Sequence, residues 1–195
     1  MIHPVITRAL KASDWGYIEK LFGTRGACGG CWCMFWRVSK GGSNWDEVKG
    51  EGNRRAFKAL LEAGEVQGVL AFDGDAPLAW LSIGPKQDFS YFERSRVFKT
   101  LASPENTWAI TCFYILPGYR GRGVAGRLLM GAKEVARASG AKWLEGYPTE
   151  PRDKDKPIPA AFAHTGVPRI FEIAGFDQVV RLGREGCRPV FRLSL

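Results

Sequence analysis

A glycine-arginine run near the middle of the chain has the residue types and spacing of an anion-binding turn. An apolar run of strand character precedes it, and an apolar stripe at helical spacing follows from about Val124. Gly121 and Gly123 let the backbone bend sharply and approach a ligand. Arg120 and Arg122 add donors that suit phosphate oxygens. Because the first N–H groups of a helix have no partner within it, the pattern predicts a phosphate site; a plain glycine-rich turn with solvated arginines is the alternative.

Two phosphate-binding patterns fit this turn. The glycines at 121, 123 and 126 match the dinucleotide fingerprint, and Glu145 falls near the place of its ribose-binding acid. However, four residues separate the strand from the first glycine, and too little chain follows for the remaining strand-helix units. Residues 120–125 fit another pattern better. They resemble the Q/R-x-x-G-x-G/A signature of the GNAT N-acetyltransferase superfamily, together with the apolar strand before it.

The resemblance extends to both ends of the chain. Residues 5–15 resemble the family's opening strand and first helix start, and residues 171–176 its late helix with a Gly-Phe ending. The likeness implies a mixed α/β fold, in which helices flank both faces of a central sheet of about six to seven strands. It also implies that two neighbouring central strands splay apart.

The same resemblance implies a function. It implies acetyl transfer from acetyl-CoA, the acyl-donor co-substrate, to a primary amine by direct attack in a ternary complex. The pantetheine arm would bond near Phe113 and Ile115. The pyrophosphate would be held by the backbone of Arg120, Gly121, Arg122, Gly123, Val124 and Ala125. A CoA-binding regulatory or structural module without catalysis is the alternative.

The catalytic groups are less clearly marked. In many members of the family a tyrosine of the late helix protonates the departing thiolate, but Phe171 stands at the matching position. Tyr114 is a substitute by residue type alone. Glu145 has apolar neighbours on an expected strand, so burial would raise its pKa and make it the candidate general base. A strand residue that faces solvent is the alternative.

A cluster of cysteines and aromatic residues lies between the first two expected helices. In GNAT folds this segment borders the acceptor pocket, so we expect the acceptor to have an apolar or aromatic part and an acidic group. The residues expected at this pocket are Trp32, Phe35, Trp36 and Arg37. A thiol or metal protein built on Cys28, Cys31 and Cys33 is a further alternative. We expect no metal, because structural zinc takes four ligands and Cys112, Cys187, His3 and His164 are isolated in the sequence.

Length and composition set the outer limits. The 195 residues predict one domain over 1–195, which the resemblance implies is N-acetyltransferase-like, with reduced thiols and a cytoplasmic location. No run reaches membrane-spanning length, so we expect no membrane partner. The net charge is +8, but no nucleic-acid-binding motif accompanies it, and an anionic cofactor explains the basic cluster at 116–142. A homodimer stays open.

Hydrophobic periodicity and turn residues predict the elements. Helices are expected from Ser13-Asp14 to about 22, then at 45–63, 124–139 and 168–174. Strands are expected at 5–10, 66–72, 77–83, 108–116, 142–147, 177–182 and 189–193.

Overall fold

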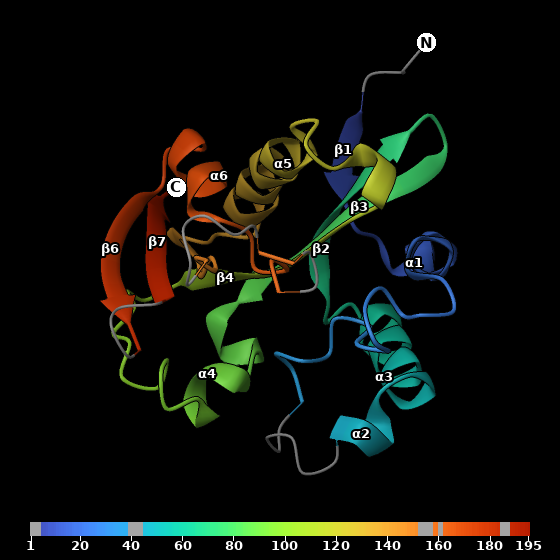
Figure 1. The fold of residues 1–195 in the computed structure, drawn as a ribbon, viewed down its shortest axis with the longest axis horizontal. Coiled ribbons are helices and arrows are strands. Elements are labelled where there is room, and N and C mark those ends of the chain that lie inside the picture. The colour runs from blue at the N-terminus through green and yellow to red at the C-terminus, as the bar shows by residue number, and fades with distance from the viewer. Residues whose placement is uncertain (1–4, 39–44, 152–157, 160–161, 184–187) are drawn as a thin grey trace.

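One mixed sheet of seven strands runs through the molecule (Figure 1). The structure is a computed structural model and describes residues 5–38, 45–151, 158–159, 162–183 and 188–195. The strand order is β1-β2-β3-β4-β5-β7-β6, in which β4 and β5 are parallel and the other neighbours antiparallel. The strands are β1 (Ile6–Ala9), β2 (Gln67–Asp73), β3 (Ala76–Pro85), β4 (Thr107–Ile115), β5 (Trp143–Gly146), β6 (Asp177–Leu182) and β7 (Arg188–Ser194).

Helices cover both faces of this sheet, which confirms the predicted mixed α/β layout. Those of the described residues are α1 (Trp15–Phe22), α2 (Trp45–Val48), α3 (Glu51–Glu62), α4 (Tyr91–Arg94), α5 (Val124–Ala138) and α6 (Pro168–Ile173). Figure 1 shows α5 and α6 on one side and α1 and α3 on the other. The apolar stripe of α5 packs its buried Leu128 and Ala132 on the first face, while Phe57 of α3 meets Trp80 on the second.

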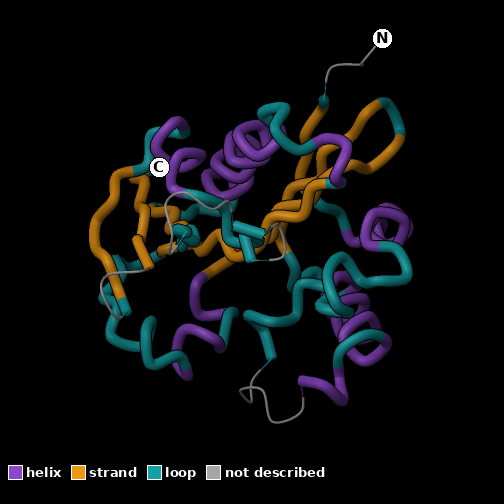
Figure 2. The backbone as a smooth tube through the Cα atoms, viewed as in Figure 1, coloured by secondary structure: helices purple, strands orange, loops and turns teal. Residues whose placement is uncertain are grey.

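The predicted helix over 45–63 is wrong at its centre. The chain forms α2 and α3 as separate helices, because Gly50 adopts a left-handed φ of +83° that no α-helix continues through. The N–H of Gly50 donates to the carbonyl of Gly30 at 2.8 Å, so the break ties this helix pair to the segment after α1. Figure 2 shows that this segment, the cysteine loop (residues 23–37), contains neither helix nor strand.

An extra residue in β4 sets which side chains reach each face. Residues 82 and 83 of β3 pair with Cys112 and Ile110, so Thr111 is unpaired and forms a bulge. Beyond the bulge, Phe113 packs on the α5 side with Ile110, and Cys112 and Tyr114 pack on the α1 side. The bulge therefore fixes which residues of β4 face each helix layer.

The two parallel strands separate after the bulge. Pairing of β4 with β5 runs from Thr107 to Ile110 and ends there, at Gly146 of β5, although β4 continues to Ile115. This confirms the predicted splay of central strands. The last half of β4 is left with an edge that β5 does not cover, and polar backbone groups on such an edge need other partners.

Candidate active site

The turn before α5 is open and exposed. Gly123 is the N-cap residue of α5 with a φ of +75°, and Gly121 has a φ of +71°. Both conformations favour glycine. A Cβ built on either glycine meets no atom within 4 Å, so space for a ligand lies directly against the backbone.

The N–H groups of this turn have no acceptor within the part of the chain that the structure describes. Those of residues 121–123 make no backbone hydrogen bond there, and those of Val124 and Ala125 belong to the first turn of α5. Side chains do not seal the turn either. Arg120 donates from Nε to the carbonyl of Ile115 at 2.9 Å, and Arg122 lies 5.9 Å from the ring of Tyr119. A row of free donors at a helix N-terminus can bind an anionic phosphate.

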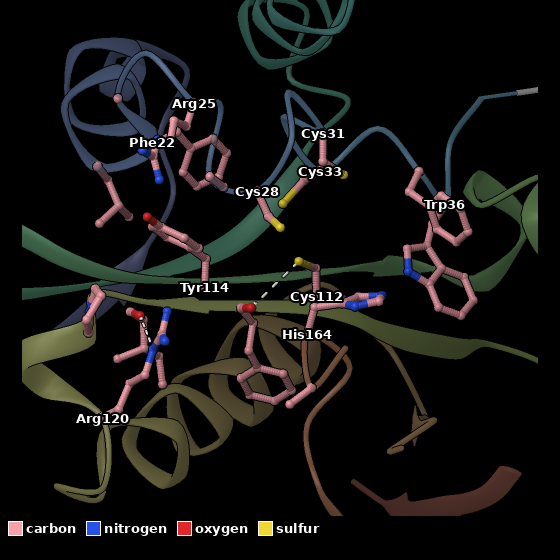
Figure 3. A pocket seen from close by; sticks show the side chains of 18 of the residues that line it. Phe22, Arg25, Cys28, Cys31, Cys33, Trp36, Cys112, Tyr114, Arg120 and His164 are labelled. Carbon is pink, nitrogen blue, oxygen red and sulfur yellow. Dashed lines mark hydrogen bonds between the residues drawn. The ribbon is translucent and has the colours of Figure 1, made fainter. Parts of the chain in front are cut away.

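A cavity of about 810 Å³ begins beside this turn and runs along the unpaired end of β4 (Figure 3). Arg120 lies at one end of it, and Trp36 and His164 lie at the other. The cysteine loop faces β4 across the cavity, with Cys28 and Cys33 opposite Cys112. The free amides and the cavity are therefore neighbours, joined at Arg120.

One backbone group expected to bind pantetheine is already used. The N–H of Phe113 donates to the carbonyl of His164 at 2.6 Å. The segment that carries His164 lies where β4 and β5 have separated, and its Gly166 carbonyl accepts the N–H of Thr149. The Phe113 side chain lines the cavity, but its amide is not an exposed strand-edge donor as the sequence reasoning assumed.

His164 is a site residue that the sequence reasoning missed. It lines the cavity, and its ring meets that of Phe35 edge-on at 6.4 Å between centroids. Among the described residues that line the cavity there is no aspartate or glutamate, so His164 is the ordinary base closest to neutral pH there. No spacing signal could have placed it, because the hydrogen bond that ties its carbonyl to the N–H of Phe113 joins residues far apart in the sequence.

The four residues expected at the acceptor pocket divide into two pairs. Phe35 and Trp36 line the cavity. Trp32 does not: it is buried and stacks on Trp15 at 5.6 Å, so it anchors the cysteine loop to α1. Arg37 does not either, since its guanidinium lies 4.4 Å from the ring of Phe89, and burial lowers its pKa. Expecting Trp32 and Arg37 at the pocket was therefore wrong.

Four thiols line the cavity, but they are not arranged as a metal site. Cys28, Cys31, Cys33 and Cys112 all contribute to its wall. No group of three or more His, Cys, Asp or Glu side chains among the described residues is placed to hold a metal ion. Burial raises the pKa of Cys31 to about 12, and the Cys33 thiol together with burial raises that of Cys112 well above its usual value. The two residues are therefore neutral thiols. His3 and Cys187 lie outside the described residues.

Glu145 lies outside this cavity, in a buried polar network. Its carboxylate accepts from Arg192 Nη2 at 2.6 Å, Lys86 at 3.1 Å, Ser103 at 2.8 Å and the Tyr147 hydroxyl at 2.7 Å. Burial favours the neutral acid, but the Lys86 charge and the hydrogen bonds outweigh it and hold the pKa of Glu145 below its usual value. The expected raised pKa is therefore wrong, and so is the solvent-facing alternative, since the side chain is fully buried.

Tyr114 and Phe171, the two aromatic residues considered for the position of the proton donor, lie in different environments. Tyr114 lines the cavity and packs edge-on against Phe22. Phe171 is fully buried, stacks on Phe191 at 5.8 Å and lies edge-on to Phe113, and it is not part of the cavity wall. At this position the chain uses an aromatic ring for core packing rather than a hydroxyl for chemistry.

The comparisons with known proteins agree with this geometry. Solved structures with the same fold include a putative acetyltransferase of the GNAT family from Desulfovibrio desulfuricans, at 16% identity and a TM-score of 0.56, over 98% of this chain and 99% of that one. The PaiA N-acetyltransferase from Thermoplasma acidophilum in complex with coenzyme A matches at 10% identity and a TM-score of 0.55, covering 98% of this chain and 99% of that one.

YncA, a putative acetyltransferase from Salmonella typhimurium solved with its cofactor acetyl-CoA, matches at 13% identity and a TM-score of 0.55, over 98% of this chain and 94% of that one. No curated protein matches the sequence. None of the described helices is both long and apolar enough to cross a membrane. The family model of the acetyltransferase (GNAT) family matches residues 38–152. With that match over more than half of its length, the chain belongs to the GNAT acetyltransferase family.

Proposed function

We propose that this protein transfers an acetyl group from acetyl-CoA to a primary amine. One observation carries the proposal: the free N–H groups of residues 121–125 open beside a cavity that is large enough for a thioester arm and a small acceptor. Anionic diphosphate suits those donors and the N-terminus of α5. Two solved proteins of the same fold hold acetyl-CoA or coenzyme A, which supports this choice of donor.

Different residues of this chain would hold different parts of acetyl-CoA. The backbone N–H groups of 121–125 would hold the diphosphate, with the side chains of Arg120 and Arg122 beside it. The N–H of Arg120, which the sequence placed in this set, already donates to the carbonyl of Pro117 at 3.3 Å. Ile115 stays a proposed backbone contact for the pantetheine arm, while Phe113 contributes its side chain to the wall. Acetyl-CoA supplies an acetyl group on a thioester, which an amine can attack once it has lost its proton.

The cavity favours direct attack by the amine over a relay through Cys31 or Cys112. A relay needs a thiolate, and thiols whose pKa is raised by burial stay protonated at neutral pH. That holds for Cys31 and Cys112. An amine, in contrast, needs only a base, and the His164 imidazole is within the same cavity. We assign His164 as the proton acceptor and Tyr114 as the proton donor to the leaving sulfur.

Two measurements test the proposal. Saturating acetyl-CoA should raise the melting temperature by binding linkage, and a panel of primary amines should release CoA that chromatography detects.

Replacement of His164 by Gln should lower kcat/KM about 100-fold and remove the acidic limb of its pH profile. Tyr114→Phe should lower kcat, because phenylalanine has no hydroxyl proton to give to the leaving sulfur.

Specific outcomes favour the alternatives. A melting shift without amine-dependent CoA release would favour a CoA-binding module, which the burial of Phe171 makes a real competitor. No shift at all, together with zinc or iron in the purified protein, would favour the thiol or metal reading. Unchanged kinetics in His164→Gln would remove His164 from the mechanism while leaving the transfer itself intact.

A further inference from the structure

The cavity wall on the α1 side is apolar except for one charge. Its described residues from α1 and the cysteine loop are mostly aromatic, aliphatic or thiol side chains, such as Phe22, Phe35 and Trp36. Arg25 is the charged residue among them. Figure 3 shows Arg25 above Tyr114, across β4 from Arg120.

Arg25 makes no ion pair or hydrogen bond through its side chain in the described part of the chain. Other arginines of the molecule are paired: Arg8 with Asp14, and Arg54 with Glu19. The backbone of Arg25 is held, because its carbonyl accepts the N–H of Gly30 at 2.9 Å. An exposed but fixed residue therefore presents an unpaired guanidinium to the cavity.

The two arginines of the cavity lie on different sides of β4. Arg120 belongs to the turn before α5 and bonds to the carbonyl of Ile115, whose side chain packs on the α5 side. Arg25 follows α1 and lies near Tyr114, which packs on the α1 side. The diphosphate of the donor would occupy the first side. Arg25 is therefore free to bind a second anion on the other side.

We propose that the acceptor is a primary amine on an apolar or aromatic frame that also carries an anionic group, such as a carboxylate, and that Arg25 binds this group. The proposal rests on the acetyl transfer argued above and names its acceptor class. A guanidinium matches a carboxylate in shape and charge through paired N–H donors. The aromatic wall suits the frame between the two polar ends.

The charges also predict that an amine without an anionic group binds poorly. A protonated amine entering this cavity meets Arg25 and Arg120, and no carboxylate is among the described lining residues. An anionic group on the same molecule offsets that repulsion. Once bound, nearby positive charge lowers the pKa of the ammonium group, which favours the neutral amine that attacks.

The test compares two acceptors that differ in one group, 4-(aminomethyl)benzoate and benzylamine. The wild-type enzyme should show a kcat/KM at least tenfold higher for the carboxylate. Arg25→Gln should raise KM for 4-(aminomethyl)benzoate about 10- to 100-fold and lower KM for benzylamine, whose ammonium group it no longer repels. KM for acetyl-CoA should stay unchanged. Arg55→Gln, an exposed arginine of α3 outside the cavity, is the matched control and should change nothing.

A binding measurement separates this proposal from the transfer itself. Benzoate, which cannot react, should quench the fluorescence of the cavity tryptophan Trp36 in wild type but not in Arg25→Gln. A preference for benzylamine, or equal benzoate binding by the two proteins, would overturn the carboxylate assignment while acetyl transfer stands. A raised KM for acetyl-CoA in Arg25→Gln would move Arg25 to the donor side. Absence of any acetyl-CoA melting shift would remove the proposed function instead.

Discussion

The turn before α5 and the cysteine loop are both glycine-rich and both border the cavity, yet they are built in opposite ways. The turn offers backbone N–H groups, and its glycines at 121 and 123 leave open space. The cysteine loop uses its glycines to pack: a Cβ on Gly30 would lie 2.4 Å from the Gly50 nitrogen. The first region offers backbone donors to a ligand, and the second positions side chains.

That difference explains why one region has a sequence signature and the other does not. A turn that offers its backbone N–H groups to a ligand needs glycine at fixed positions, since few other residues adopt a φ above +20°. A side-chain wall accepts many residue types, provided that its anchors are buried. In the cysteine loop those anchors include Trp32, which itself adopts a positive φ of 44°.

The largest expected effect is a loss of stability, and it concerns Glu145, which lies neither in the turn before α5 nor in the cysteine loop. Glu145→Gln should lower the free energy of unfolding by about 3–5 kcal/mol, because Lys86 and Arg192 would then be buried without their shared carboxylate. Urea unfolding at pH 7 measures this loss. Glu134→Gln, an exposed residue paired with Arg137 on α5, is the control and should change stability by less than about 0.5 kcal/mol.

The pH dependence of that loss follows from the lowered pKa of Glu145. A carboxylate with a depressed pKa stabilises the fold above its unfolded pKa of about 4.3 and loses this contribution as pH falls through the folded value. The gap between wild type and Glu145→Gln should therefore shrink below about pH 4. A stable Glu145→Gln protein whose kcat alone has collapsed would return Glu145 to the role of base.

The second largest effect tests whether the backbone N–H groups of the turn before α5 bind the diphosphate. Gly123→Asp should weaken acetyl-CoA binding about 100-fold, because its carboxylate would lie beside the free N–H groups and repel the diphosphate. Gly123→Asn is the matched control, since Asn and Asp have nearly the same shape and both tolerate a left-handed φ. Titration with acetyl-CoA measures the two affinities. Equal losses in the two variants would mean that backbone strain, and not charge, governs the turn.

The sequence was a good guide to the elements, while the binding of diphosphate by residues 120–125 stays a prediction. Alternating and helical periodicities mark strands and helices over several residues, and the sheet has the seven strands expected from them. The break at Gly50 was missed because its cause, a bond to Gly30, joins residues that lie far apart in the sequence.

The cavity wall was predicted in part only. Phe35 and Trp36 line the cavity, and their contact with an acceptor stays a prediction. His164 and Arg25 were not predicted at the cavity, because residues that lie far apart in the sequence meet there. Glu145 was misjudged because apolar neighbours indicate burial, whereas its partner cations come from residues 86 and 192 on other segments.

The smallest effect sharpens the account of the cysteine loop. At pH 8, a thiol with a pKa of about 12 is ionised in roughly one molecule in ten thousand, so Cys31 should resist iodoacetamide. Cys112, whose pKa is also raised, should resist it as well, while the exposed Cys28 reacts first. Peptide mass mapping over time gives the order, and unfolding in urea should make the three rates similar. Early labelling of Cys31 in the folded protein would mean that the loop holds a reactive thiolate beside the cavity, and the cysteine relay would then replace direct attack by the amine.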